Sequence, residues 1–195
     1  GGLRLGLLAV FAVGSWLVLD MWDAAMETLS LMCISIAISV TIGVLFGIMA
    51  SQNDRFETII KPILDTMQTL PAFIYLIPAF YLFGLGAPGA ILATVIYALP
   101  PVVRLTNLGI RQAPADIDEA ATSFGATKIQ SLVKVKIQMA MPAIKLGINQ
   151  TVMMALALVV LATFIAAPGL GDIVFRGMQR LNVGKALEGG VAIVL

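Results

Sequence analysis

The sequence contains no histidine and only one cysteine, Cys33. Without histidine the chain lacks the commonest general base and the commonest nitrogen ligand for metals. A single cysteine inside an apolar run excludes an internal disulfide and a multi-cysteine metal framework. No serine, cysteine or carboxylate pair stands near a plausible base. We therefore expect no catalytic residue, no metal ion and no enzymatic activity on this chain.

The phosphate-binding pattern GxxxxGK[ST] is also missing. This loop cradles the phosphates of a nucleotide, so a chain without it cannot bind ATP in that way. We expect no cofactor on this chain. If the protein serves an ATP-driven process, ATP and magnesium must be held by a partner subunit.

Charged residues are scarce at 12%, whereas hydrophobic residues make up 59%. Soluble domains carry about 25% charged residues, so this composition indicates a membrane protein. The net charge of +1 gives no reason to expect a nucleic-acid partner. Because helices satisfy their own backbone groups within lipid, we expect an all-α polytopic bundle in contact with membrane lipid.

The apolar runs predict five full membrane spans and the start of a sixth. A span needs about 20 mostly apolar residues. The expected spans cover about 5–19, 26–50, 63–83, 90–103 and 143–166, and the sixth begins near Gly189. Residues 51–61 should form a polar link between the second and third spans. The final seven residues are too few to cross a membrane, so we expect the sequence to be part of a longer chain.

Two prolines, Pro71 and Pro78, should break the third span, because proline lacks a backbone donor and bends a helix. Such breaks are tolerated at membrane depth where protein or a water-lined cavity satisfies the freed backbone groups. Polar residues stand close to the first break and in the fifth span. The candidates for lining a translocation pathway are Gln68, Thr69, Pro71 and Asn149.

Plainer interpretations of these polar residues stay open. Asn149 and Gln150 could hydrogen-bond across helices and hold them together. Lys61 and Asp65 are four residues apart and could form an ion pair at the start of the third span.

Small residues recur every fourth position in the second span, at Ser35, Ser39, Gly43 and Gly47. Such a ridge lets another helix approach closely, although small residues can also gather by chance. We expect a helix–helix contact along this ridge.

The longest polar interval, residues 114–142, predicts two short helices at a membrane surface. An apolar stripe with helical spacing suits the first helix, with Ile117, Ala120, Ala121 and Phe124. Carboxylates in its early turns favour the positive end of the helix dipole. Gly125 can end the helix in the left-handed conformation, and Thr127 with Gln130 can cap the next helix.

Lysine and arginine indicate the orientation. Residues 104–145 hold six of them, whereas the turn at 84–89 holds none. The positive-inside rule therefore places the polar interval in the cytoplasm. Arg176, Arg180 and Lys185 fall on the opposite side by this count, which is a conflict within the predicted topology.

Glu119, Ala120 and Ala121, followed after three residues by Gly125, resemble the EAA loop of bacterial ABC importer permeases. The family pattern ends in a proline where this chain has Gln138. Further blocks resemble the permease of glycine betaine/proline betaine importers, and the likeness runs from about 27 to 195. These blocks are residues 65–78, 98–110, 123–126, 141–151 and 167–181.

The resemblance implies the type I ABC importer permease fold, as a single transmembrane domain over 1–195 with a cytoplasmic coupling loop at about 105–141. It implies that this loop docks on a separate ABC ATPase subunit. The implied docking residues are Ile117, Glu119, Ala120, Ala121, Phe124 and Gly125. Further implied partners are a second permease copy and an extracytoplasmic substrate-binding protein or domain.

The resemblance also implies a function: uptake of a betaine-like compatible solute across a bacterial inner membrane, for osmoprotection. One alternative keeps the class and changes the cargo to another small amine, an amine oxide or an amino acid. An ion-coupled secondary transporter is a further alternative. Such proteins usually show charges within their spans and two matching halves, neither of which is visible here.

Overall fold

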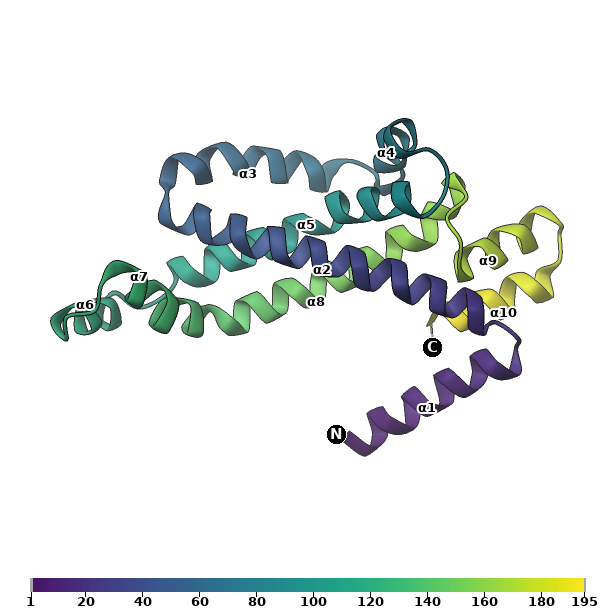
Figure 1. Cartoon of the computed structure of the whole chain (residues 1–195), viewed down its shortest axis with the longest axis horizontal. Helices are drawn as coiled ribbons and strands as arrows, with labels where there is room; N and C mark the ends of the chain where they lie inside the picture. The colour runs from purple at the N-terminus through teal and green to yellow at the C-terminus, as the bar shows by residue number, and fades with distance from the viewer. Residues whose placement is uncertain (1, 195) are drawn as a thin grey trace. The chain divides into compact units, whose positions relative to one another are not determined.

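A computed structural model describes residues 2–194, and the side chains of these residues apart from 4, 5 and 8. Every regular element in this range is helical, which confirms the all-α prediction (Figure 1). The α-helices are α1 (Gly2–Val18), α2 (Trp22–Gln52), α3 (Asp54–Thr69), α4 (Leu76–Phe83), α5 (Ala87–Arg111), α6 (Ala115–Ser123), α7 (Lys128–Ser131), α8 (Ile137–Leu161), α9 (Leu170–Gln179) and α10 (Val183–Val194). Two 3₁₀ segments, η1 (Ala72–Tyr75) and η3 (Ala162–Ile165), and one π-helical segment, η2 (Leu132–Lys136), complete the chain.

Three helices in the described range are long and apolar enough to cross a membrane: Trp22–Gln52, Ala87–Arg111 and Lys128–Ile165. The last of these runs without interruption through α7, η2, α8 and η3. A fourth span exists only if α3 and η1–α4, which a short break separates, count as one. The described residues therefore provide three spans from single helices, or four with the bent pair, instead of the five full spans expected. The predicted first span lies in α1, which is too short to be counted among them.

The predicted third span is divided at Pro71. Leu70 has the extended conformation that a following proline imposes (φ −74°, ψ 136°), and its N–H closes α3 on the Thr66 carbonyl oxygen at 3.3 Å. Pro78 causes no break, because η1 and α4 form one helical segment, Ala72–Phe83, that continues through this proline. The expected polar link at 51–61 is also wrong, since α3 already begins at Asp54. The Asn53 side chain accepts from the N–H groups of Arg55 and Phe56, which starts this helix early.

The chain forms two compact units, and α2, α5 and α8 each contribute to both. One unit contains the chain up to Ser35, Ala72–Thr94 and the chain from Leu156 onward. Its packing joins α9 to the start of α2, because the Leu170 N–H donates to Thr28 Oγ1 at 2.8 Å.

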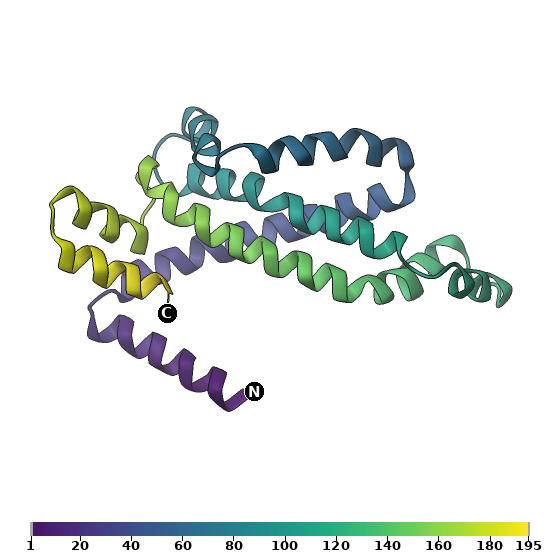
Figure 2. The ribbon, with the colours of Figure 1, turned by 180° about the vertical axis from the view of Figure 1, so that it is seen from behind.

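The other unit contains Ile36–Pro71 and Val95–Ala155. Here α2, α5 and α8 run side by side, and the α6–α7 hairpin lies beyond the ends of α5 and α8 (Figures 1 and 2). Two apolar clusters form its core. One consists of Ala50, Ile60, Leu64 and Val103, and the other of Ile110, Ala140 and Ile144.

The predicted ridge of small residues packs against α5. Ser39 is fully buried, and its hydroxyl donates to the Val95 carbonyl oxygen at 3.3 Å. A Cβ atom added to Gly43 would stand 2.2 Å from Val102 Cγ1, and one added to Gly47 would stand 2.8 Å from the Val103 carbonyl oxygen. The two backbones therefore approach so closely that only glycine fits at these positions.

This contact predicts that Gly47→Ala destabilises the protein. The new methyl group would lie 2.5 Å from Thr106 Cβ, so backbone must move, and such overpacking costs about 1–3 kcal/mol. We expect a lower thermal unfolding temperature in detergent. Gly190→Ala is the matched control, because nothing lies within 4 Å of a Cβ at that position. Equal unfolding temperatures for the two variants would refute the close contact.

Candidate functional site

The polar interval folds into the predicted pair of short helices. Pro114 precedes α6, and Gly125 after it adopts φ +82°, the left-handed conformation that glycine tolerates best. The Ala126 N–H donates to the Ala121 carbonyl oxygen at 3.0 Å and so closes the turn. The predicted glycine stop of the first helix is confirmed.

The second helix begins with the predicted capping box. The Thr127 side chain accepts from the Gln130 N–H at 3.3 Å, and the Gln130 side chain accepts from the Thr127 N–H at 2.9 Å. The helix then continues through η2 into α8 without a break. Gln138 has the backbone N–H that a proline would lack, so the departure from the family pattern removes an obstacle to this continuation. The π-helical turn itself was not predicted.

Asp118 ties the two short helices together. The Ser131 hydroxyl donates to Asp118 Oδ1, and Lys136 Nζ lies 2.7 Å from Asp118 Oδ2. These hydrogen bonds, first that from Lys136 and then that from Ser131, hold the pKa of the Asp118 carboxyl below its ordinary value. Sequence reasoning gave Asp118 only a role at the helix dipole. No short-range spacing signals partners 13 and 18 residues away.

The apolar stripe on α6 stays open to the surroundings. Phe124 is 93% exposed, Ala120 is exposed, and Ile117 and Ala121 are half-buried. Glu119 is exposed beside them. Ile129 on α7, 74% exposed, extends the apolar surface. The chain therefore holds the hairpin rigidly through polar ties and leaves its apolar face uncovered.

The candidate pathway residues are exposed, and the structure does not join them into one site. Gln68 and Thr69 lie in the last turn of α3, and Pro71 follows directly at the break. Asn149 lies on α8. Within the part of the chain that the structure describes, no hydrogen bond or ion pair links Asn149 or Gln150 to another helix. The assignment of these residues to a pathway stays a prediction.

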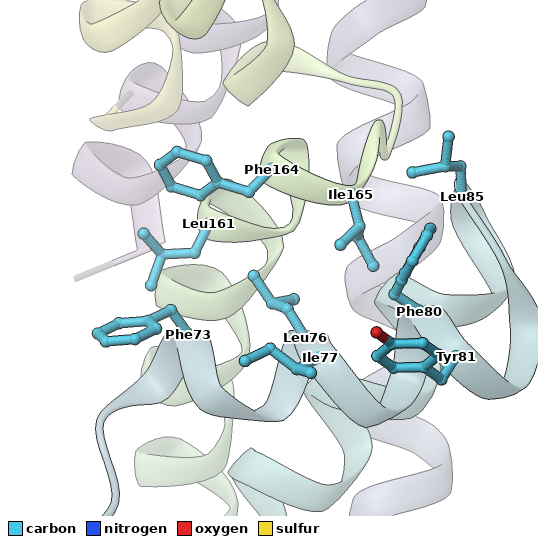
Figure 3. A pocket seen from close by; sticks show the side chains of 9 residues that line it. All are labelled: Phe73, Leu76, Ile77, Phe80, Tyr81, Leu85, Leu161, Phe164 and Ile165. Carbon is cyan, nitrogen blue, oxygen red and sulfur yellow. The ribbon is translucent and has the colours of Figure 1, made fainter.

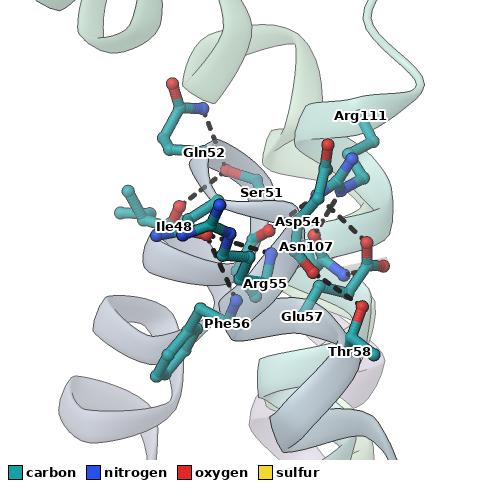
Figure 4. Close-up of polar contacts among 12 residues, drawn as sticks. Ile48, Ser51, Gln52, Asp54, Arg55, Phe56, Glu57, Thr58, Asn107 and Arg111 are labelled. Atoms are coloured by element: carbon teal, nitrogen blue, oxygen red, sulfur yellow. Dashed lines mark hydrogen bonds and ion pairs between the residues drawn. The ribbon is translucent and has the colours of Figure 1, made fainter.

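Sequence reasoning missed a polar network between α3 and α5. Asp65 pairs with Arg104 of α5, so the expected Lys61–Asp65 pair is wrong. Closer to the end of α5, Arg111 pairs with Asp54 at 2.7 Å and with Glu57 at 3.0 Å (Figure 4). The available signal was the matched spacing of acids on one helix and arginines on another.

One unit also contains an apolar groove of about 630 Å³ (Figure 3). It offers a polar solute one hydroxyl, that of Tyr81, and no charge, so we place no solute site there. The lining residues are Phe73, Leu76, Ile77, Phe80, Tyr81, Leu85, Leu161, Phe164 and Ile165.

The fold and the hairpin define a class of membrane protein. A family model described as the binding-protein-dependent transport system inner membrane component matches residues 39–195. The match covers most of the chain, so the protein belongs to this family. Permease chains of the inward-facing MetNI methionine ABC transporter have a similar fold, with a TM-score of 0.75 at 22% identity, covering 88% of this chain and 87% of the other. The predicted type I importer permease fold is confirmed.

Among relatives, the chain is similar to permeases whose names specify methylated amines. It is 48% identical to the glycine betaine/proline betaine permease ProW of Salmonella typhimurium, over 98% of this chain and 52% of that protein. It is 44% identical to the glycine betaine permease OpuAB of Bacillus subtilis, over 96% of this chain and 68% of that protein. The trimethylamine N-oxide permease TmoV of Ruegeria pomeroyi is 37% identical, over 100% of this chain and 30% of that protein. The chain thus spans about half the length of ProW.

The Asp118 tie predicts how the hairpin responds to acid. Because its pKa is lowered on folding, the carboxylate stabilises the hairpin at all pH values above its ordinary pKa of 3.8, and this stabilisation is lost as the pH falls through the lower folded value. Amide hydrogen exchange of residues 115–136 should therefore stay slow, after correction for intrinsic rates, from pH 7 to about pH 4.

Asp118→Asn should exchange faster at pH 7 and lose the acid transition. Asp116→Asn is the matched control, since Asp116 is an exposed carboxylate of the same helix and forms no ion pair among the described residues. If Asp118→Asn exchanges its amide hydrogens at the same rates as the unmodified protein, Asp118 does not stabilise the hairpin.

Proposed function

We propose that this chain is the transmembrane permease subunit of an ATP-driven importer for a betaine-like compatible solute such as glycine betaine or proline betaine. A separate ATPase subunit would dock on the α6–α7 hairpin. The observation that carries the proposal is the exposed apolar stripe of α6, because Phe124 is 93% exposed on a hairpin that polar ties hold in shape.

The solute class is supported by relatives of two kinds. ProW and OpuAB are named for glycine betaine, and TmoV is named for trimethylamine N-oxide. All of these solutes carry a methylated nitrogen. An amine oxide is therefore the second candidate cargo, whereas none of these three relatives is named as an ion-coupled transporter.

The partners follow from what the sequence lacks and from the family description. No phosphate-binding loop is present, so ATP and magnesium would be bound by the ATPase subunit. The family is named for dependence on a binding protein and for the inner membrane. We expect that receptor on the outer side, the hairpin in the cytoplasm, and a second copy of the permease completing the pathway.

The pathway would pass close to the break between α3 and η1. Gln68 and Thr69 place an amide and a hydroxyl in the last turn before Pro71, and Asn149 would contribute a second amide. Uncharged polar groups can bind a zwitterionic solute and release it again, which suits a passage rather than a tight site.

Docking through the α6 stripe predicts that Ala121→Trp abolishes binding of the ATPase subunit. A bulky ring at this half-buried position would prevent close approach of another backbone. Glu119→Ala should weaken binding less, since a contact through an exposed charge is worth about 0–1 kcal/mol. The measurement is co-purification of the ATPase subunit from detergent, with glycine betaine-stimulated ATP hydrolysis as the second readout.

Ala115→Trp is the matched control, because Ala115 is an exposed alanine on the opposite face of α6. It should retain the ATPase subunit. Retention by Ala121→Trp as well would show that the stripe is not the docking surface. Failure of the parental chain to bind any ATPase subunit would overturn the proposed function itself.

The break at Pro71 predicts a defect in transport when this proline is replaced. Pro71→Ala restores a backbone N–H donor. It also removes the cost of about 3 kcal/mol that a proline imposes on a helix continuing through its position. We expect glycine betaine uptake to fall about tenfold at matched expression and unchanged membrane insertion. Pro78→Ala is the control, since Pro78 lies in the first turn of α4 and interrupts nothing. Parental uptake by Pro71→Ala would exclude a role for the break.

A further inference from the structure

Arg111, the last residue of α5, holds three helices together through one guanidinium group. Its Nη2 donates to the Ala50 carbonyl oxygen of α2 at 2.8 Å and to Asp54 Oδ1 of α3 at 2.7 Å, and it lies 3.0 Å from Glu57 Oε2. Its Nε donates to Asn107 Oδ1 one turn earlier on α5 at 3.1 Å. Figure 4 shows the side chains of Asp54, Glu57, Asn107 and Arg111 converging where α2 passes into α3. Three of these four oxygen atoms share the two hydrogens of Nη2, and Nε serves the fourth, so two nitrogens of one planar group bind residues of three helices.

The inner part of this cluster is partly shielded from solvent. The side chains of Arg111 and Glu57 are 32% and 30% exposed. Asn107 Nδ2 donates to the second carboxylate oxygen of Glu57 at 2.8 Å, so both oxygens of Glu57 are bound to α5. Charge-assisted bonds with partial shielding are stronger and less easily screened than isolated surface pairs.

The contact between α3 and α5 continues from this end toward the break in α3. Arg104, Asn107 and Arg111 recur at i, i+3 and i+7, which places them on one face of α5. Arg104 pairs with Asp65, which lies six residues before Pro71. Between the two ion-paired regions, Ile60 and Leu64 are buried against Val103. The helix α3 is therefore fixed to α5 along most of its length.

At its other end this contact lies next to the hairpin. Only residues 112–114 separate Arg111 from the first residue of α6. Two of them remain hydrogen-bonded to α5, because the N–H of Gln112 donates to the Leu108 carbonyl oxygen at 2.9 Å and that of Ala113 donates to the Ile110 carbonyl oxygen at 3.3 Å. Because residues 112–114 are few and two of them are hydrogen-bonded to α5, α6 cannot move far without also moving the end of α5.

We propose that Arg111 is a positioning residue that transmits movement of α6 to α3, and through α3 to the break at Pro71. This inference rests on the proposed function, since it supposes that an ATPase subunit moves α6. It goes beyond docking, because it names the route by which that movement reaches the membrane-embedded helices. Arg111 itself contacts neither the ATPase nor the solute in this route.

The test uses the assembled transporter containing this chain, reconstituted in vesicles with its ATPase subunit and solute receptor. Glycine betaine is the transported probe. Arg111→Gln should retain the ATPase subunit, while the amount of glycine betaine taken up per ATP hydrolysed falls about fivefold or more, the lower end of common coupling strengths between two sites. Arg111→Lys keeps the charge but not the fork, so it should recover part of this ratio.

Arg55→Gln is the matched control. It removes a positive charge from an exposed position in the first turn of α3, where Arg55 forms no ion pair among the described residues. It should keep the parental ratio of uptake to hydrolysis. This control separates a local role of Arg111 from a general effect of charge at this end of the protein.

A purely structural role would lower expression and unfolding temperature while leaving the ratio of uptake to hydrolysis unchanged, and that result would overturn the inference. If Arg111→Gln does not assemble, the ratio in Arg111→Lys decides: a parental ratio overturns the inference and a reduced one supports it. The outcomes also separate the two proposals. If the unmodified chain binds no ATPase subunit, the proposed function is refuted. If the unmodified chain transports glycine betaine and the Arg111 variants have the same ratio of uptake to hydrolysis, only the role of Arg111 is refuted.

Discussion

The close approach of α2 and α5 is the contact on which the arrangement of Ile36–Pro71 and Val95–Ala155 depends. Gly43 and Gly47 have no side chain, so Val102 and Thr106 fit directly against the backbone of α2. Because α3 follows α2 after a single capping residue, Asn53, this approach also brings α3 against α5, on a neighbouring face that carries Arg104 and Arg111. The acids of α3 then meet the arginines of α5. A close helix contact that depends on two glycines thus brings together the charged groups of α3 and α5, which the proposed transmission of movement would use.

Two groups of ion-paired residues in this part of the chain hold its helices in place, whereas another surface is apolar. Arg111 with Asp54 and Glu57 joins the ends of three helices, and Asp118 with Lys136 fixes the hairpin. In contrast, the apolar stripe of α6 is left uncovered, with Phe124 93% exposed. Ion pairs with defined partners hold shape, whereas an apolar face binds whatever complementary surface excludes water from it. A hairpin kept rigid in this way can pass a movement on instead of absorbing it.

The sequence predicted several local features correctly because each has a local physical cause. Gly125 at positive φ, the capping box of Thr127 and Gln130, and the division at Pro71 follow from backbone stereochemistry within a few residues. The close contact at Gly43 and Gly47 followed from the spacing of small residues. In contrast, the number of spans and the start of α3 were wrong, since hydropathy reports where a chain is apolar and not where its helix begins.

By itself the sequence determined the helical membrane class, the two-helix polar interval, the absence of a nucleotide-binding loop and the family. These depend on composition, on short motifs and on residues close together in the chain. Only the tertiary structure decided that Asp65 pairs with Arg104 instead of Lys61, that Asp118 bridges the hairpin, and that Arg111 joins three helices. The physical reason is that a charged side chain chooses its partner by distance in space. That distance is set by how the helices pack together. The spacing of small residues predicts that α2 has a close helix contact, but not which charged side chains this contact brings together.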